Sequence, residues 1–511
     1  MQALPNFING KFVPVSNRPT VDVVSPATGE ILCKVPLSTA ADLDVAVSHA
    51  QEAFNAWSSV TIKQRAAIMF KFHSLVDKHA NELAGIIVRE NGKNMTEALA
   101  DVAKGNETAE WATSLPQLAA GKKLEVSKGI YCEEIRKPLG VVGAIVPFNF
   151  PLMVPFWTIP IALTMGNCVI LKPSEKVPLT MQRVCELFIE AGLPDGVFQV
   201  VHGAVEVVTS ICAHPGISAV SFVGSSKVAE IVATSCRQRN KRVLALGGAK
   251  NHLVALQDAD TGMAARDIVA SFAGCAGQRC MAASVLIVVG ENPALIDQIV
   301  SAASALKPGQ EAGQVGPVID GIAQKRILGY ITDAEAKYGA KILLDGRKWS
   351  QERPQGFWVG PTILLHENKT DPALLDEIFG PVLSIIHVNS FEEALEIENN
   401  NPYGNAASIY TERGANAEYF TKRFRAGMLG INIGIPVPRE PFTFGGLYGT
   451  ASKFGDFDVT GDGAMEFFSN RIKITSKWTS SYATGPATQG NMPKRASQEG
   501  LQDKANFDGR M

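Results

Sequence analysis

The stretch Val141-Val142-Gly143-Ala144-Ile145-Val146, between Gly140 and Pro147, is an apolar run that predicts a buried strand. From there to residue 246 the chain alternates strand-like and helix-like segments. The expected strands are 141–146, 168–171, 198–201, 219–223 and 242–246, and the expected helices are 179–191, 206–212 and 225–239. Gly192-Leu193-Pro194 ends the first of these helices. Repeated βαβ units with almost continuously apolar strands predict a parallel sheet covered on both faces.

The rest of the chain divides around this block. A second α/β block is expected from about 253 to 435, with strands near 285–289, 341–344 and 382–387, and a helical region is expected at about 40–120. Residues 124–139 alternate and break at Lys128-Gly129, which predicts a hairpin, and residues 471–478 alternate as well. Residues 479–511 are polar with almost no aliphatic side chains, so we expect a disordered tail.

Composition narrows the class of protein. The chain has 511 residues, a formal net charge of −2 and 46% hydrophobic residues, which is ordinary for a globular protein and gives no basic surplus for nucleic acid. Residues 1–7 lack the pattern of a signal peptide or a mitochondrial presequence, and no apolar run is long enough to span a bilayer. Eight cysteines occur without a disulfide framework or CxxC spacing, so we expect a reducing compartment, by default the cytoplasm, and no metal site.

Cys280 is the candidate catalytic nucleophile. It ends the run Phe272-Ala273-Gly274-Cys275-Ala276-Gly277-Gln278-Arg279-Cys280. A cysteine attacks as the thiolate, and a neighbouring cation such as Arg279 favours that form. Small residues in the run leave room for a substrate to approach. The alternative is a buried, inert cysteine, which is the usual fate of a free thiol.

Five further motifs accompany Cys280 in a fixed order. They are Pro147-Phe148-Asn149-Phe150-Pro151, Leu171-Lys172-Pro173-Ser174-Glu175, Ser221-Phe222-Val223-Gly224-Ser225-Ser226, Glu377-Ile378-Phe379-Gly380-Pro381-Val382 and Pro441-Phe442-Thr443-Phe444-Gly445-Gly446. Over residues 5 to 478 the chain resembles the aldehyde dehydrogenase superfamily. Gly248-Ala249-Lys250-Asn251-His252 and Gly277-Gln278-Arg279-Cys280-Met281-Ala282 most resemble its CoA-acylating methylmalonate-semialdehyde dehydrogenase branch.

The resemblance implies an α/β aldehyde dehydrogenase fold in three parts. A Rossmann-like NAD-binding domain would comprise residues 1–123 and 140–252, and an α/β catalytic domain would comprise residues 253–440. A β arm at 124–139 and 455–478 would pair with a neighbouring subunit and form a homo-oligomer, a dimer or a homotetramer. An ordinary surface hairpin is the alternative for the first of these arm segments.

The same resemblance implies which residues act. Cys280 would be the nucleophile, and the Asn149 amide with the Cys280 N–H would stabilise the oxyanion. The cofactor-binding residues would be Phe148, Lys172, Glu175, Gly224, Ser225, Glu377 and Phe379. Gly224-Ser225 follows a strand and opens a helix, where backbone N–H groups favour a phosphate, although a plain helix cap explains the pair equally well. The Glu175 carboxylate would repel a 2′-phosphate, which favours NAD over NADP.

One position separates two possible outcomes of the reaction. Hydrolytic members of the superfamily carry Glu-Leu-Gly-Gly-Lys, whose glutamate activates water, and this chain has Leu246-Gly247-Gly248-Ala249-Lys250 in its place. Leu246 cannot act as a base. The acyl-enzyme should therefore wait for another nucleophile, which in the acylating branch is CoA. A base supplied by a distant segment is the alternative.

The substrate follows from charged residues that match the family. Arg279 matches one of two arginines that bind the substrate carboxylate, and Lys104 occupies the position of the other, while Arg439 is a candidate replacement for the missing guanidinium. We therefore predict NAD-dependent oxidation of a (methyl)malonate-type semialdehyde, with decarboxylation and transfer to CoA giving propionyl-CoA or acetyl-CoA. The alternatives are a hydrolytic or acylating dehydrogenase of another small aldehyde, a thiol hydrolase, for which no partner histidine lies near Cys280 in the sequence, and a non-catalytic protein that retains the fold.

Overall fold

The first seven-stranded sheet has the order β11-β10-β7-β8-β9-β1-β2. The computed structural model describes residues 3–478, so the tail expected at 479–511 lies outside the described residues. The sheet comprises β11 (Arg242–Leu246), β10 (Ile217–Val223), β7 (Val141–Ile145), β8 (Cys168–Lys172), β9 (Phe198–Val200), β1 (Asn6–Ile8) and β2 (Lys11–Val13). Strands β7 to β11 pair in parallel, and β1 pairs antiparallel with both β2 and β9. The parallel sheet predicted from residue 141 onward is confirmed.

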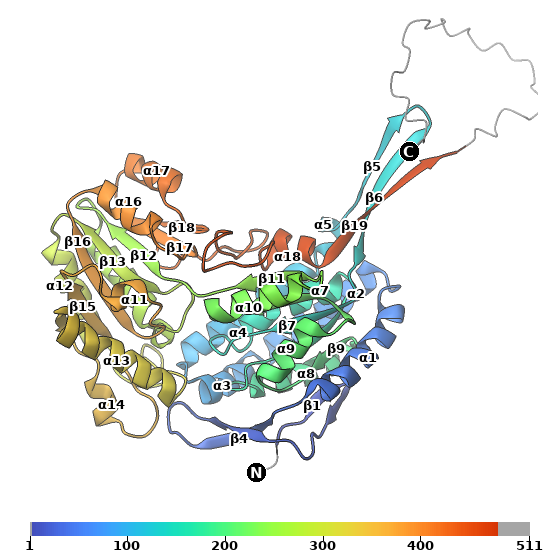
Figure 1. Ribbon diagram of the computed structural model, residues 1–511, viewed down its shortest axis with the longest axis horizontal. Coiled ribbons are helices and arrows are strands. Elements are labelled where there is room, and N and C mark those ends of the chain that lie inside the picture. The colour runs from blue at the N-terminus through green and yellow to red at the C-terminus, as the bar shows by residue number, and fades with distance from the viewer. Residues whose placement is uncertain (1–2, 479–511) are drawn as a thin grey trace, which may run out of the picture. The chain divides into compact units, whose positions relative to one another are not determined.

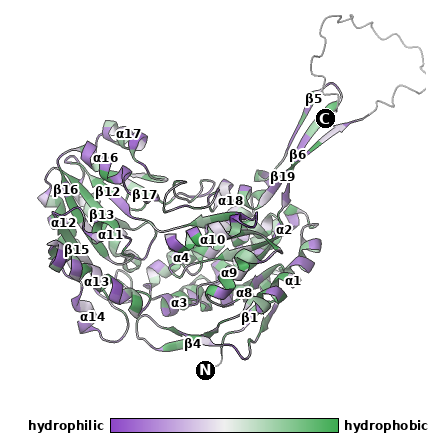
Figure 2. Cartoon of the chain, viewed as in Figure 1, coloured by the Kyte–Doolittle hydropathy of each residue, from purple (hydrophilic) through white to green (hydrophobic). Residues whose placement is uncertain are grey.

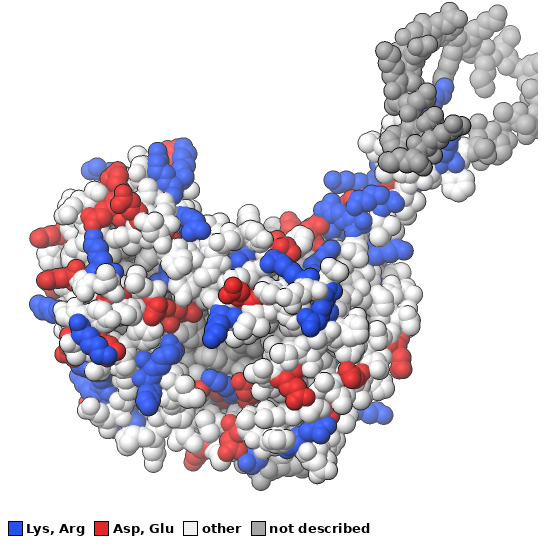
Figure 3. Space-filling view, viewed as in Figure 1, with Lys and Arg blue, Asp and Glu red and all other residues white. Residues whose placement is uncertain are grey.

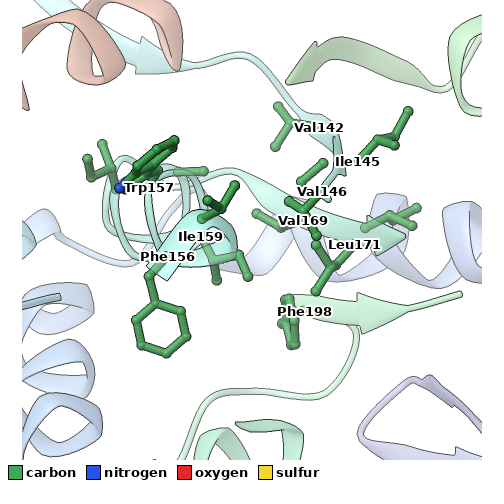
Figure 4. Packing of buried hydrophobic residues seen from close by; sticks show 14 of the residues in the cluster. Val142, Ile145, Val146, Phe156, Trp157, Ile159, Val169, Leu171 and Phe198 are labelled. Atoms are coloured by element: carbon green, nitrogen blue, oxygen red, sulfur yellow. The ribbon is translucent and has the colours of Figure 1, made fainter. Parts of the chain in front are cut away.

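Helices cover this sheet (Figure 1). They include α1 (Ala40–Trp57), α8 (Leu179–Ala191), α9 (Val205–Ala213) and α10 (Ser226–Arg237). Helix α8 ends at Gly192, which adopts the left-handed conformation that glycine tolerates at a helix C-terminus. Side chains of β7, β8 and β9 pack against Phe156, Trp157 and Ile159 in one continuous core (Figure 4).

The helical region expected at about 40–120 lies beside this sheet. It continues after α1 with α2 (Ile62–Lys78), α3 (Ala80–Asn91), α4 (Met95–Ala112) and α5 (Leu115–Leu118). A separate two-stranded sheet precedes it, formed by β3 (Thr20–Val24) and β4 (Ile31–Pro36). Thr61 and Asn94 cap the N-termini of α2 and α4 with their side chains, which explains where these two helices begin.

The second seven-stranded sheet has the order β14-β15-β16-β13-β12-β17-β18. It comprises β14 (Lys341–Leu344), β15 (Thr362–His366), β16 (Val382–Val388), β13 (Ala283–Val289), β12 (Asn251–Ala255), β17 (Ala406–Tyr410) and β18 (Met428–Ile431). Helices α11 (Thr261–Ala273), α12 (Pro293–Ser304), α13 (Gly321–Tyr338), α16 (Phe391–Asn399) and α17 (Gly414–Arg423) accompany it. Its inner strands are green in Figure 2 because most of their residues are hydrophobic. Such strands are typical of a sheet buried on both faces.

The chain divides by its contacts into two units, residues 1–120 with 136–472 and a small unit that contains 121–135 and the residues from 473 onward. The small unit holds most of a three-stranded sheet of order β19-β6-β5, with β5 (Lys122–Ser127), β6 (Ile130–Pro138) and β19 (Ser469–Lys477). The hairpin expected at 124–139 is confirmed. Helix α18 (Gly461–Phe467) lies inside the range 455–478 that was expected as arm, because Phe467 is fully buried in the core of the first sheet.

Charged side chains of both signs are mixed over the surface of the face seen in Figure 3. This agrees with the formal net charge of −2. Within residues 3–478, no helix is both long enough and apolar enough to cross a membrane.

Candidate active site

A cavity of about 290 Å³ collects residues that the sequence motifs singled out. The first sheet contributes the loops that follow its strands β7, β10 and β11, and the second part of the chain contributes the cysteine and the segment around 377–379. The lining residues are Pro147, Phe148, Asn149, Val154, Val223, Gly224, Ser225, Gly247, Gly248, Cys280, Arg326, Glu377 and Phe379. Loops at the carboxyl ends of parallel strands are where ligands bind in open α/β sheets.

Cys280 is held by a turn of unusual backbone conformation. Between α11 and β13, Cys275, Ala276 and Gly277 have φ angles of 49°, 52° and 69°. Such a left-handed run is costly for the two residues that carry a Cβ, and strain of this kind is concentrated at functional sites. Gly277 has no substitute, because a Cβ there would lie 2.0 Å from the Gly380 carbonyl oxygen. The turn therefore presses the cysteine segment against the loop that follows Phe379.

The backbone and thiol of Cys280 are both constrained. Its carbonyl oxygen accepts hydrogen bonds from Asn251 Nδ2 at 2.8 Å and Asn405 Nδ2 at 2.9 Å. Burial, and after it the Glu377 carboxylate, raise the pKa of Cys280 to about 12. The expected activation by Arg279 is a smaller effect, so the thiol form dominates at neutral pH in this state of the site.

The Asn149 amide reaches the cysteine segment directly. It lies in the loop between β7 and α6 (Met153–Phe156), and its Nδ2 donates to the carbonyl oxygen of Gln278 at 3.0 Å. Gln278 stands two residues before Cys280. A side-chain amide beside the nucleophile can donate to an oxyanion that forms there. The structure brings Asn149 and Cys280 into one cavity, and the oxyanion role of Asn149 stays a prediction.

The N-terminus of α10 opens into the same cavity through Gly224 and Ser225. Among the described residues, the Ser225 hydroxyl makes no capping hydrogen bond, so the plain cap weighed from the sequence does not explain this serine. Ser226 is engaged elsewhere, since its hydroxyl accepts from Gly248 N at 2.9 Å and donates to the Ala451 carbonyl at 2.6 Å. Uncapped N–H groups at a helix N-terminus suit a phosphate.

Lys172 and Glu175 lie outside the lining of this cavity, at the end of β8. Lys172 Nζ donates to Glu175 Oε2 at 2.8 Å, and the Lys172 side chain is 6% exposed. Burial works to raise the pKa of Glu175, but the charge and hydrogen bond of Lys172, together with a backbone hydrogen bond and the Lys176 charge, hold that pKa below its usual value. Glu175 is therefore a carboxylate that can accept hydrogen bonds from ribose hydroxyls.

Glu377 and Phe379 complete the cavity, and Arg326 joins them without any signal in the sequence. Glu377 accepts a hydrogen bond from Ala249 N at 2.9 Å, and burial raises its pKa to about 7. Phe379 meets Phe148 edge to face, with ring centroids 5.9 Å apart. Arg326, on α13, donates to the Ile378 carbonyl. Nothing in the helical pattern of α13 marks this arginine, because its role depends on a contact 52 residues away.

Arg279 does not line the cavity that contains Asn149. Its guanidinium donates to Cys275 Sγ at 3.2 Å, to the Ala270 carbonyl at 3.1 Å and to Glu97 at 3.4 Å. It lines a second cavity of about 630 Å³, together with Glu97. Burial still raises the pKa of Cys275, so this thiol behaves as a buried packing residue.

Lys104 and Arg439 are brought together by one carboxylate. Glu107 accepts from Lys104 Nζ at 2.7 Å and from Arg439 Nη1 at 2.7 and 2.9 Å. Burial works to raise the pKa of Glu107, but the two cations outweigh it and hold that pKa below its usual range. The structure does not bring Arg279 into this group, so the three cations expected at one carboxylate site occupy two places.

Comparison with known proteins decides the family. The aldehyde dehydrogenase family model matches residues 12–474. The chain belongs to the aldehyde dehydrogenase family. Two relatives are malonate-semialdehyde dehydrogenase 1 of Geobacillus thermodenitrificans (strain NG80-2) and malonate-semialdehyde dehydrogenase of Lacticaseibacillus casei. Each is 43% identical to this chain over 94% of its length. The match covers 99% of the Geobacillus protein and 97% of the Lacticaseibacillus protein.

Solved structures agree with this assignment. Methylmalonate-semialdehyde dehydrogenase from Oceanimonas doudoroffii superimposes with a TM-score of 0.92 at 38% identity, covering 94% of this chain and 99% of its own. A Sinorhizobium meliloti 1021 protein complexed with NAD superimposes with a TM-score of 0.91 at 38% identity, over the same shares of the two chains. The family resemblance and the aldehyde dehydrogenase fold predicted from the motifs are confirmed.

In this aldehyde dehydrogenase the position of the hydrolytic glutamate lies at the end of β11. Leu246 is 4% exposed, and its carbonyl oxygen accepts a hydrogen bond from Gly224 N at 3.1 Å. Among the described residues that line the 290 Å³ cavity, Glu377 carries the one carboxylate. It lies 131 residues after Leu246 in the chain. Glu377 is therefore the candidate for a base supplied by a distant segment.

Proposed function

We propose that the protein oxidises a small malonate-type semialdehyde with NAD and passes the acyl group from Cys280 to CoA. The observation that carries the proposal is the cavity that joins Cys280, Asn149 and the N-terminus of α10, with Leu246 at the place of the hydrolytic glutamate. The relatives' names, malonate-semialdehyde dehydrogenase, support the class of substrate.

The residues of the cavity fit the steps of such a reaction. The Cys280 thiolate adds to the aldehyde carbon, and the Asn149 amide and the Cys280 N–H donate to the oxygen that becomes negative. Bound NAD would supply the acceptor for the hydride. Gly224 and Ser225 would hold its pyrophosphate at the N-terminus of α10, and Glu377 and Phe379 would hold its nicotinamide ribose and ring. What remains on Cys280 is a thioester.

We assign recognition of the substrate carboxylate to the three cations predicted for it, which are Lys104, Arg279 and Arg439. Lys104 and Arg439 share Glu107, and Arg279 faces the larger cavity behind the cysteine turn. Loss of the substrate carboxylate as CO2 from the thioester leaves an acetyl or propionyl group on Cys280. The thiol of CoA then displaces the Cys280 sulfur and leaves as acetyl-CoA or propionyl-CoA.

A second candidate is a hydrolytic dehydrogenase of another small aldehyde. The Glu377 carboxylate favours it, because burial raises its pKa to about 7, which suits a general base at neutral pH. The hydrogen bond that Glu377 accepts from Ala249 N weighs against this role, because it holds the carboxylate in place.

The test is a panel of aldehydes assayed for NADH with and without CoA. Malonate semialdehyde without CoA should give a burst of about one NADH per site and then slow turnover, and CoA should restore turnover and yield acetyl-CoA. Equal steady rates with and without CoA would favour the hydrolytic candidate. If propanal is a better substrate than malonate semialdehyde, the proposed binding of a substrate carboxylate is wrong.

We further propose the NAD-binding domain at 1–123 and 140–252, the catalytic domain at 253–440 and the arm at 124–139 and 455–478. Exposed apolar side chains on the three-stranded sheet, at Leu124, Val126, Ile472 and Ile474, support pairing with another subunit in a homo-oligomer, for which we propose a tetramer. All eight cysteines are free, which supports a cytoplasmic location.

A further inference from the structure

Three polar side chains from one short segment hold the loop that carries Asn149. Asn91 Nδ2 donates to the Phe148 carbonyl at 2.8 Å, Lys93 Nζ lies 3.7 Å from the centre of the Phe150 ring, and Asp101 Oδ1 accepts from Met153 N at 2.8 Å. The contacts fall on both neighbours of Asn149 and on the residue that begins α6. Asn91 ends α3, Lys93 lies in the linker that follows, and Asp101 lies in the second turn of α4.

Lys93 and Asp101 also form a buried ion pair. Lys93 Nζ lies 2.7 Å from Asp101 Oδ2, and the two side chains are 2% and 0% exposed. Each Asp101 oxygen therefore has its own partner, one a charge and the other a backbone N–H. Burying two charges costs free energy that their attraction does not generally recover, and apolar pairs often serve stability as well. Stability alone therefore does not explain why Lys93 and Asp101 are buried as an ion pair.

Fixing the Asn149 loop explains the pair, because an oxyanion donor must be held in place before the negative charge develops. Asn149 makes one hydrogen bond of its own, to the Gln278 carbonyl, and its loop lies outside regular secondary structure. A displacement of about 1 Å at a reacting centre costs on the order of 100-fold in rate.

We propose that Lys93 and Asp101 are positioning residues for the oxyanion donor, with Asn91 holding the preceding carbonyl. The proposal rests on the proposed function of Asn149. Lys93 fixes Phe150 from its ring face, Asp101 fixes the Met153 N–H, and the ion pair keeps both contacts in one geometry. None of the three side chains needs to touch the substrate.

A double-mutant cycle tests the proposal. Lys93→Met/Asp101→Asn removes both charges together, so neither is left buried alone, and the asparagine can still accept from Met153 N. We expect the NADH burst rate with saturating malonate semialdehyde to fall about 10- to 100-fold. Asn149→Ala alone should lower it about 100- to 1,000-fold. In the Asn149→Ala background the double substitution should cost less than about threefold, because the donor it positions is gone.

Two further readouts separate positioning from general damage. NAD affinity and the alkylation rate of the Cys280 thiol should stay within about twofold of the unmodified enzyme, since Gly224, Ser225 and Cys280 lie on other segments of the chain and the Asn91 bond to Phe148 is kept. Glu90→Gln is the matched control, because Glu90 is a buried carboxylate on α3 that accepts from Leu179 N at 2.6 Å and Thr180 N at 2.9 Å. It should lower thermal stability with the same effect on rate in both backgrounds.

The outcomes are distinguishable. Equal fold-losses for the double substitution in both backgrounds, or no loss in either, would overturn the positioning role. An unchanged burst in Asn149→Ala would instead overturn the role of Asn149 itself. If Lys93→Met/Asp101→Asn does not fold, Asp101→Asn alone, which preserves the shape of the side chain, is carried through the same cycle with the same criteria.

Discussion

Glu107→Gln separates a substrate-binding role of Lys104 and Arg439 from an ordinary surface network. Glu107 is the carboxylate that both cations share, at 2.7 Å from Lys104 and 2.7 Å from Arg439. The side chains of Lys104, Glu107 and Arg439 are 35%, 38% and 57% exposed, so each pair contributes only about 0.2–1 kcal/mol. The substitution should therefore lower the free energy of unfolding by less than about 2 kcal/mol.

The effect on the substrate should have the opposite sign. A substrate carboxylate now competes with Glu107 for the two cations, and removal of that competitor is worth about 1 kcal/mol, or about fivefold in KM. We expect the KM for malonate semialdehyde to fall about fivefold, with the gain shrinking at high salt, while the KM for propanal changes less than about twofold. Steady-state kinetics with CoA at low and high NaCl measures both.

The control for this experiment is Asp333→Asn, which breaks an exposed pair with Lys337 at 2.9 Å on α13. It should leave both KM values unchanged. Lys104→Met should act against Glu107→Gln and raise the KM for the semialdehyde alone. An unchanged semialdehyde KM in Glu107→Gln, or an equal change for propanal, would refute the reasoning and leave Lys104 and Arg439 as surface cations.

Three further predictions concern the chemistry of the cavity. Cys280→Ala should abolish NADH formation and keep NAD binding, whereas Cys275→Ala should retain most activity in the same assay; the reverse result would reassign the nucleophile. Glu377→Gln should lower the pKa of Cys280 and speed its alkylation at pH 8, because the repulsion between the Glu377 carboxylate and the thiolate is removed; an unchanged rate would mean that burial alone raises that pKa. Leu246→Glu should introduce CoA-free turnover that increases with pH, since Leu246 is buried, burial raises the pKa of a carboxyl group, and only the ionised form is a base; a pH-independent gain would contradict this.

Much of the fold follows from local sequence. The strand at 242–246 and the helix at 179–191 are found with the predicted bounds, because an apolar run and a glycine stop are signals carried by a few neighbouring residues. The arm was less predictable. Residues 461–467 form α18 because Phe467 packs into a distant core, and alternation in the following residues gives no sign of that contact.

The site divides in the same way. Cys280 and Asn149 are marked by motifs, and the cavity contains both. The direction of Arg279 depends on the left-handed turn at 275–277, which brings its guanidinium onto Cys275 instead of Cys280. Arg326 and the pair of Lys93 with Asp101 act through contacts far apart in sequence, which no single-sequence pattern reports.

The segment after β11 links these observations to the fate of the acyl group. In hydrolytic relatives it delivers a base, whereas here its backbone forms hydrogen bonds with several neighbouring segments. The Leu246 carbonyl accepts from Gly224 N, Gly248 N donates to the Ser226 hydroxyl, and Ala249 N donates to the Glu377 carboxylate. A Cβ at position 248 would lie 2.2 Å from Glu377 Oε2, so a glycine is what lets that carboxylate approach. The segment thus orients the cofactor loop and Glu377 while its own side chains supply no proton acceptor beside Cys280, and an incoming thiol becomes the favoured acceptor of the acyl group.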